Sequence, residues 1–173
     1  PNNQGNTPGH IAASLGDIDT MKKLMEKGCK MTEVNTLSWT PLYYALRNKK
    51  TECSLFLIEN KCYNTEAESF ITVLQEAAQF NETECVKALI EEGFEIMDPN
   101  HNCWSLVHFI CGAGCAELIP YIFEKFGKDA FTDIDRLDRN CAQIAVINGN
   151  MSIIEELEKI QSAVNTPEFD LFS

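Results

Sequence analysis

Two histidines and three cysteines lie close together in the second half of the chain, and they are the residues whose types could support chemistry: His101, Cys103, His108, Cys111 and Cys115. Imidazole and thiolate are ligands that zinc prefers, and a cysteine beside a histidine can act as a nucleophile. The spacing matches no zinc finger and contains no CxxC pair. Nothing near Cys115 and His108 indicates a lowered thiol pKa or a third, orienting group. The sequence therefore predicts neither a metal site nor a catalytic pair here.

Other signatures of catalysis are also missing from the sequence. The chain contains no glycine-rich phosphate-binding loop and no G-x-S-x-G turn around a nucleophilic serine. No pair of carboxylates stands out as an acid and base. We therefore expect a protein that is not an enzyme and that needs no cofactor.

Composition and charge narrow the classes of partner. The 173 residues are 45% hydrophobic, which is enough for one domain or one repeat array. The formal net charge of -12 repels nucleic acid and anionic lipid surfaces, and favours a basic partner. No long apolar run or signal peptide is present, so we expect no membrane insertion and a location in the cytoplasm or the nucleus.

A ten-residue pattern recurs about every 33 residues, and it sets the elements that must position any functional residue. Its copies begin at Thr7, Thr40, Thr72, Ser105 and Asn140. A second segment follows each copy, with apolar residues three and four apart, as on one face of a helix. This period predicts five helix-turn-helix repeats, at approximately 3–34, 35–66, 67–99, 100–134 and 135–165, followed by a tail at 166–173.

The first copy carries a family resemblance. Gly5-x-Thr7-Pro8-x-His10-x-Ala12-Ala13-x-x-Gly16 is similar to the signature of the ankyrin repeat family. Later copies depart from it, with Lys49 and Asn81 where the family has glycine and Leu106 where it has proline. The resemblance implies an all-α ankyrin-repeat solenoid with β-hairpin-like loops, forming a single ankyrin-repeat domain over 1–173. The chain begins inside a consensus hairpin without a polar capping repeat, so we expect an excerpt from a longer protein.

The repeat register also gives the cysteines a structural interpretation. Five of them fall where the family has small or apolar core residues: Cys29, Cys53, Cys62, Cys85 and Cys111. A free cysteine behaves as a small buried hydrophobe. We therefore expect reduced thiols in the core, as is usual for proteins inside the cell.

The family binds its partners on a concave face, which is formed by the hairpin tips and the outer turns of the first helices. Carried over to this chain, the resemblance implies a partner-binding set: Leu37, Trp39, Arg47, Ile71, Gln79, Phe80, His101, Trp104, Arg136 and Arg139. Aromatic residues and arginine dominate binding hot spots. The alternative is that each tryptophan only covers its own hairpin.

The sequence thus predicts a protein–protein interaction module, a scaffold or adaptor that binds another protein or a peptide. The alternative function is a regulatory or assembly arm of a larger kinase- or channel-type chain, packed on that chain's own domains. Partner identity and oligomeric state stay open at this point. The acidic, aromatic tail has three interpretations, namely a short peptide motif, a cap over the fifth repeat, or a disordered end.

Overall fold

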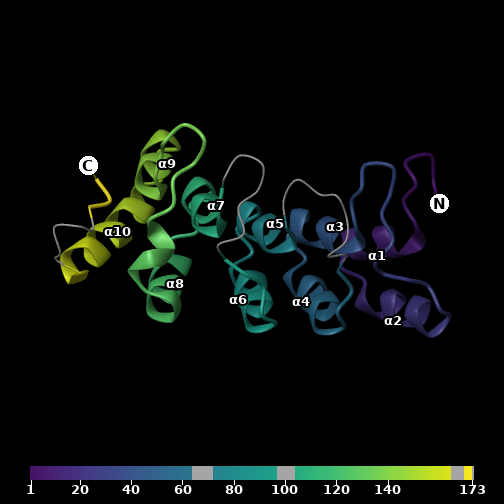
Figure 1. Cartoon of the computed structure of the whole chain (residues 1–173). Helices are drawn as coiled ribbons and strands as arrows, with labels where there is room; N and C mark the ends of the chain where they lie inside the picture. Colours follow the sequence, from purple (N-terminus) through teal and green to yellow (C-terminus); the bar gives the residue numbers. More distant parts are fainter. Residues whose placement is uncertain (64–71, 97–103, 165–169, 173) are drawn as a thin grey trace. The chain divides into compact units, whose positions relative to one another are not determined.

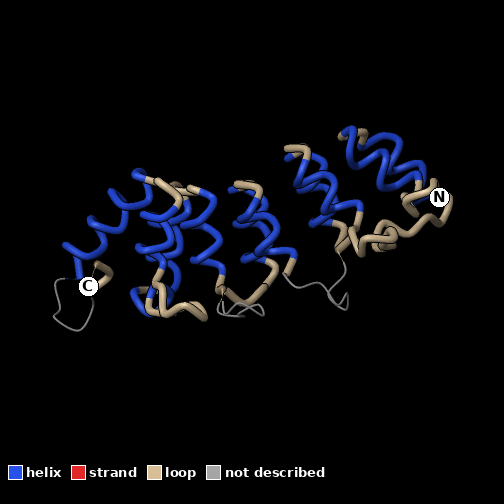
Figure 2. Tube along the Cα trace, turned by 90° about the horizontal axis from the view of Figure 1, so that it is seen from above, coloured by secondary structure: helices blue, strands red, loops and turns tan. Residues whose placement is uncertain are grey.

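The computed structural model describes residues 1–63, 72–96, 104–164 and 170–172. These residues form ten α-helices and one short 3-10 helix, and no strand occurs among them (Figures 1 and 2). The expectation of an all-α fold of the ankyrin-repeat type is confirmed. The chain divides into two compact units, Pro1–Gly93 and Phe94–Ser173, here called unit 1 and unit 2.

Unit 1 contains three helix pairs. They are α1 (Pro8–Leu15) with α2 (Ile18–Glu26), α3 (Pro41–Arg47) with α4 (Thr51–Glu59), and α5 (Val73–Gln79) with α6 (Thr83–Glu91). The first helices α1, α3 and α5 lie side by side in one layer, and the second helices form the other layer (Figure 1). The loops that precede α1 and α3 stand beyond the end of the first layer (Figure 1).

Unit 2 contains two further pairs with a short helix between them. They are α7 (Leu106–Ala113) with α8 (Leu118–Phe126), then η1 (Lys128–Phe131), and α9 (Cys141–Ile147) with α10 (Met151–Val164). Helix α7 packs against α9 and α8 packs against α10, which repeats the arrangement of unit 1. No helix in the described residues has the length and apolar content needed to cross a membrane.

The first helices begin at polar residues that satisfy free backbone amides. Asn140 accepts from the amide of Gln143, and Gln143 in turn accepts from the amide of Asn140, at 2.9 and 3.0 Å. Thr72 and Gln75 form the same reciprocal pair at α5. Such capping boxes fix where a helix starts. They place the loop before each first helix at a defined position.

The helix ends show how the degenerate copies differ from the family pattern. Gly16 and Gly114 end α1 and α7 in the left-handed conformation, with φ of 77° and 82°. At the equivalent joints Lys49 and Asn81 adopt φ of 56° and 55° without being glycine. A left-handed non-glycine residue costs roughly 1 kcal/mol. The turn geometry therefore survives the loss of glycine, at a cost in stability.

The core consists of small and branched side chains between the two layers. The pairs Ala12-Ala13 and Ala77-Ala78 are buried, which allows neighbouring helices to approach closely. Four of the five register-assigned cysteines are buried as expected: Cys53, Cys62, Cys85 and Cys111.

The expectation for Cys29 was wrong, because this side chain is exposed. It lies just beyond α2, whose one buried side chain is that of Met21. In the described residues α2 has helical neighbours on one side only, so the residues at its end are not enclosed. The equivalent Cys62, after α4, has α6 as a further neighbour and is buried.

Residues 170–172 of the tail pack on the last helix pair. Leu171 is buried, its carbonyl accepts from Asn140 Nδ2 at 3.1 Å, and its amide donates to Gln161 Oε1 at 3.0 Å. This part of the tail forms a strap across α9 and α10. It agrees with the interpretation of the tail as a cap, whereas 165–169 and 173 lie outside the described residues.

Candidate partner-binding surface

The loop before α3 is built around the buried side chain of Asn35. Its Oδ1 accepts from the amides of Leu37 and Trp39, at 2.9 and 3.0 Å. Its Nδ2 donates to Asn6 Oδ1 in the preceding loop, at 2.7 Å. One amide group thus holds the turn and ties two loops together. Leu37 is left at the tip with 55% of its surface exposed.

His10 fixes the backbone of Trp39 from the neighbouring repeat. Its Nδ1 accepts from the amide of Thr7, at 3.1 Å, and its Nε2 lies 2.9 Å from the carbonyl oxygen of Trp39. Burial lowers the pKa of His10, so the ring is neutral at pH 7. Because Nδ1 accepts, Nε2 carries the proton and donates to Trp39. The position of Trp39 is therefore set by α1 as well as by its own loop.

The side chain of Trp39 belongs to a continuous row that we call the aromatic ladder, consisting of Arg47, Trp39, Tyr43 and Phe80. The Arg47 guanidinium carbon lies 5.4 Å from the Trp39 ring centroid. Trp39 stacks on Tyr43 at 4.6 Å and 19°, and Tyr43 meets Phe80 edge-on at 5.5 Å. All four residues belong to unit 1. The three rings are half-buried, so their free faces form a rigid apolar strip.

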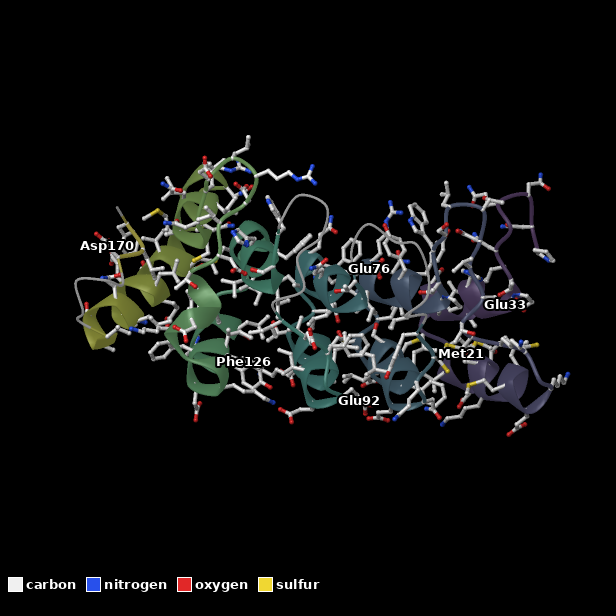
Figure 3. The ribbon with its side chains drawn as sticks, viewed as in Figure 1. Met21, Glu33, Glu76, Glu92, Phe126 and Asp170 are labelled. Carbon is white, nitrogen blue, oxygen red and sulfur yellow. The ribbon has the colours of Figure 1, made fainter. Side chains whose placement is uncertain are left out.

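Two ionisable groups set the electrostatics of the ladder. Arg47 is exposed and has no carboxylate at ion-pair distance in the described residues. Glu76 on α5 is half-buried (Figure 3), and burial raises its pKa to about 8. Burial likewise raises the pKa of the Tyr43 hydroxyl, with Arg47 acting in the opposite direction and Glu76 in the same one. At neutral pH the ladder therefore carries a cation next to a carboxyl that is mostly protonated.

The equivalent loop of unit 2 is built around Asp135. Its Oδ1 accepts from the amides of Leu137 and Arg139, at 2.8 and 3.0 Å, as Asn35 does in unit 1. Its Oδ2 accepts from Arg139 Nη2 at 2.6 Å and from Trp104 Nε1 at 3.1 Å. Burial acts to raise the pKa of Asp135, but the hydrogen bonds from Arg139, Leu137 and Trp104 outweigh it and leave the pKa well below its usual range.

Trp104 is therefore engaged differently from Trp39. Its ring packs edge-on against Phe109 at 5.3 Å and lies over His108 at 6.2 Å. The ion pair with Asp135 similarly engages the guanidinium of Arg139. The contacts of Trp104 and Arg139 hold the loop of unit 2 in place, whereas the Trp39 ring is held by its contacts with the rings of Tyr43 and Tyr44 and with the Arg47 guanidinium.

The structure brings three of the sequence-predicted site residues into one cluster: Trp39, Arg47 and Phe80. Gln79 is exposed at the end of α5, and Leu37 stands at the loop tip. Arg136 is exposed on the loop of unit 2. Ile71 and His101 lie outside the described residues. The set thus divides between the units, with the continuous apolar part in unit 1.

Sequence reasoning missed Tyr43, which joins Trp39 to Phe80. Its signal was present, because Tyr43 occupies the histidine position of the Thr-Pro-Leu-His motif and follows Trp39 by four residues. Asn35 and Asp135 were also missed. Each stands four residues before the side chain that it helps to position, a spacing shared by the two loops.

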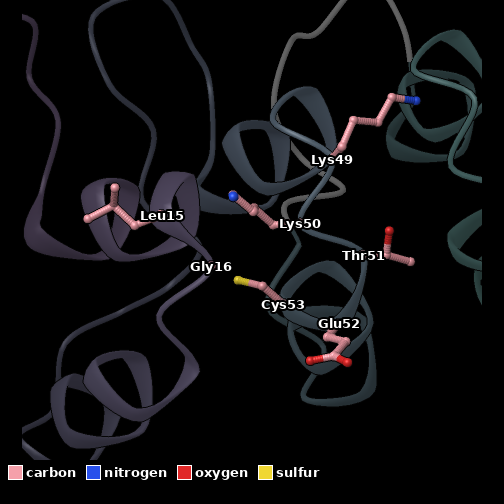
Figure 4. Close-up of a pocket in the computed structure, with 7 residues that line it drawn as sticks. All are labelled: Leu15, Gly16, Lys49, Lys50, Thr51, Glu52 and Cys53. Atoms are coloured by element: carbon pink, nitrogen blue, oxygen red, sulfur yellow. The ribbon is translucent and has the colours of Figure 1, made fainter.

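A shallow pocket of about 430 Å³ opens between the end of α1 and the start of α4 (Figure 4). Its lining includes Leu15, Lys49, Lys50 and Cys53. Leu15 is 68% exposed, and Lys49 Nζ lies 3.8 Å from Glu82 Oε1. Burial raises the pKa of the Cys53 thiol to about 11, so this thiol is not a nucleophile at neutral pH. The pocket, which Thr51 and Glu52 also line, offers polar and apolar contacts rather than chemistry.

His108, a described member of the histidine and cysteine cluster, has a structural role. His108 Nδ1 accepts from the amide of Ser105 at 3.2 Å, and its Nε2 lies 3.4 Å from the carbonyl of Arg139. Both ring nitrogens are thus engaged as those of His10 are. Within the described residues no three histidine, cysteine or acidic side chains come together as a metal site. His101 and Cys103 lie outside the described residues.

Comparison with known proteins agrees with this architecture. A family model described as "Ankyrin repeats (3 copies)" matches residues 1–69. The chain is 26% identical over 159 residues to the human protein "Transient receptor potential cation channel subfamily A member 1", covering 87% of this chain and 14% of that protein. It is 26% identical over 133 residues to the yeast (Saccharomyces cerevisiae) "Probable 26S proteasome regulatory subunit p28", covering 75% of this chain and 58% of that protein.

A third relative is "Ankyrin repeat and KH domain-containing protein mask-1" of Caenorhabditis elegans. It is 28% identical over 153 residues, which cover 88% of this chain and 6% of that protein. The chain thus spans less than two thirds of the length of each of these relatives. The matches run along most of the chain, beyond the residues that the family model covers.

Proposed function

We propose that this chain, which is built of ankyrin repeats, is a protein-interaction module and that it binds its partner on the aromatic ladder of unit 1. Ankyrin repeats generally bind other proteins, and this general property is the first support for the proposal. The observation that carries it is the continuous row from Arg47 through Trp39 and Tyr43 to Phe80. Half-buried rings held in place by their neighbours bury apolar area on binding without losing much side-chain freedom.

The chemistry of the site supports binding rather than catalysis. Burial raises the pKa values of the Cys53 and Cys85 thiols to about 11 and 12, and the described histidines are used as structural links between repeats. Free thiols buried in the core also suit a reducing compartment, which supports the proposal that the module works in the cytoplasm or the nucleus. The net charge of -12 would favour a partner whose overall charge is positive, at distances that salt does not screen.

A second candidate function is that of a regulatory or assembly arm within a larger chain. The likeness to a cation channel subunit, of which this chain spans 14%, favours it. In that case the ladder would contact another domain of the same protein. Addition of the isolated module to the rest of such a chain would restore the contact, and substitution of Trp39 would abolish it.

The main test compares two tryptophan variants in a pull-down from cell extract, followed by calorimetry with the recovered partner. Trp39→Ala should weaken binding by about 2 kcal/mol or more, because aromatic anchors carry a large share of interface energy. It should cost little stability. Trp104→Ala should lower the melting temperature more, since Trp104 donates to the buried Asp135.

Phe126→Ala supplies the matched control, because Phe126 is an exposed aromatic residue of unit 2 outside the ladder. It should leave affinity unchanged. If Trp39→Ala lowers the melting temperature strongly yet binds the partner like the wild type, the ring only packs its loop and the proposed site is wrong.

A further inference from the structure

Arg47 is a cation that has no ion-pair partner among the described residues. Its guanidinium lies over Trp39, at the last residue of α3, and its side chain is exposed. A guanidinium over a ring still directs its N–H groups outward in its own plane, where they match the two oxygens of a carboxylate. No described carboxylate takes that position, although the chain has 26 acidic residues against 14 basic ones.

The segment that follows Arg47 is also cationic. Lys49 and Lys50 come next after one asparagine, at the edge of the pocket beside α1. Lys49 is paired with Glu82, whereas Lys50 has no ion pair in the described residues. Glu76, whose negative charge would raise the pKa of Tyr43, is mostly protonated at neutral pH because of its burial. The ladder itself therefore carries the positive charge of Arg47 within an acidic chain.

From this geometry we infer that the ladder receives an acidic segment of the partner, in which a carboxylate pairs with Arg47 and a neighbouring apolar side chain covers Trp39 and Phe80. The inference rests on the proposed function and names the chemistry of the partner. The carboxylate would accept two parallel hydrogen bonds from the Arg47 guanidinium that lies over Trp39. The apolar residue would bury the free faces of the rings.

The overall charge does not oppose this assignment at contact distance. At physiological salt, charges more than about 8 Å apart on the surface are largely screened. The net charge of -12 therefore slows the approach of an acidic segment but does not decide the contact made at Arg47. A basic segment would meet the Arg47 guanidinium, which has no ion-pair partner in the part of the chain that the structure describes, and this occupant is the competing outcome of the test.

The experiment selects peptides from a display library of short random sequences on the intact chain. Parallel selections use Arg47→Gln, Arg47→Lys and the control Lys30→Gln, which makes the same change of charge at an exposed site of unit 1. We expect the wild type to enrich peptides with aspartate or glutamate next to an aromatic or leucine residue. Synthesised peptides should bind Arg47→Gln about tenfold more weakly or worse, and Lys30→Gln like the wild type.

The lysine variant separates a directed pair from general charge. Arg47→Lys keeps the positive charge but lacks the planar fork, so it should recover only part of the lost affinity. Full recovery would show that the carboxylate is not held by the fork and would overturn the paired geometry. Because Arg47 is exposed, all variants should melt like the wild type, which a thermal scan checks in the same samples.

The remaining outcomes separate the two proposals. Enriched peptides that are basic or neutral, or that ignore Arg47 while still requiring Trp39, would overturn the acidic segment and leave the ladder as the binding site. A library that yields no peptide dependent on Trp39 would overturn the proposed site itself. Enrichment of acidic peptides that requires both residues supports both proposals.

Discussion

Replacing Glu76 by glutamine should stabilise the protein at neutral pH and make no difference in acid. Burial raises the pKa of Glu76 from 4.5 to about 8. A folded pKa above the unfolded one means that the fold prefers the protonated form. The stability associated with that form is complete below pH 4.5 and is lost as the pH rises through 8. Glutamine keeps the shape of the neutral acid and never ionises.

The size of the effect follows from the shift. Each pKa unit corresponds to about 1.4 kcal/mol, so full burial would cost the wild type about 3 kcal/mol at pH 7. Glu76 is half-buried, and water screens part of this cost, which leaves a gain of about 1–2 kcal/mol for Glu76→Gln. Above pH 8 the gain should approach its maximum, and at pH 4 it should disappear.

Urea denaturation followed by tryptophan fluorescence at several pH values measures this difference. Glu59→Gln is the matched control, since Glu59 is an exposed glutamate at the end of α4 and has no bonded partner in the described residues. The control should follow the wild type at every pH. If the free energies of unfolding of Glu76→Gln and the wild type run parallel from pH 4 to 9, Glu76 is ionised in the fold and the burial argument is refuted.

Two further predictions concern the loop of unit 2 and the thiols. Asp135→Asn should lower the free energy of unfolding by about 2 kcal/mol at pH 7, because Trp104 and Arg139 lose a charged acceptor. The difference should begin to shrink below pH 4, where the carboxyl group of the unfolded chain becomes protonated, and it should disappear only as the pH falls to the lowered pKa of the folded state. Equal stability at pH 7 would contradict the assigned bonds. Iodoacetamide should label Cys29 in the native protein well before Cys53 or Cys85, as followed by mass spectrometry. Equal labelling rates would show that the core thiols are accessible.

Much of the fold follows from the sequence because its determinants are local. The capping residues such as Thr72 and Asn140 act within one turn of helix, and the period of about 33 residues repeats the same helix pair along the chain. Their outcome needs no knowledge of distant contacts. Lys49 and Asn81 show the same point, since the joint that the family closes with glycine forms in their presence.

The surface was harder to foresee because it depends on contacts across repeats. Trp39 and Trp104 share one position in the repeat, yet one stacks on Tyr43 and the other donates to Asp135 from the following repeat. The repeat register predicts the same role for residues at the same position in each repeat, so it could not distinguish Trp39 from Trp104. Cys29 was misassigned for a related reason, because its burial depends on a neighbouring helix rather than on its place in the repeat.

The left-handed lysines of unit 1 have a mechanical consequence. Lys49 and Lys61 stand where a glycine would relax the backbone, and their side chains reach Glu82 and Glu92 of the next helix pair, at 3.8 and 3.6 Å. Each joint thus accepts backbone strain and gains an ionic clasp along the stacking direction. Both ion pairs join the second helix pair to the third, so a force that pulls these pairs apart would act on them. Salt weakens exposed ion pairs. We therefore expect a higher ionic strength to lower the force at which the two helix pairs separate.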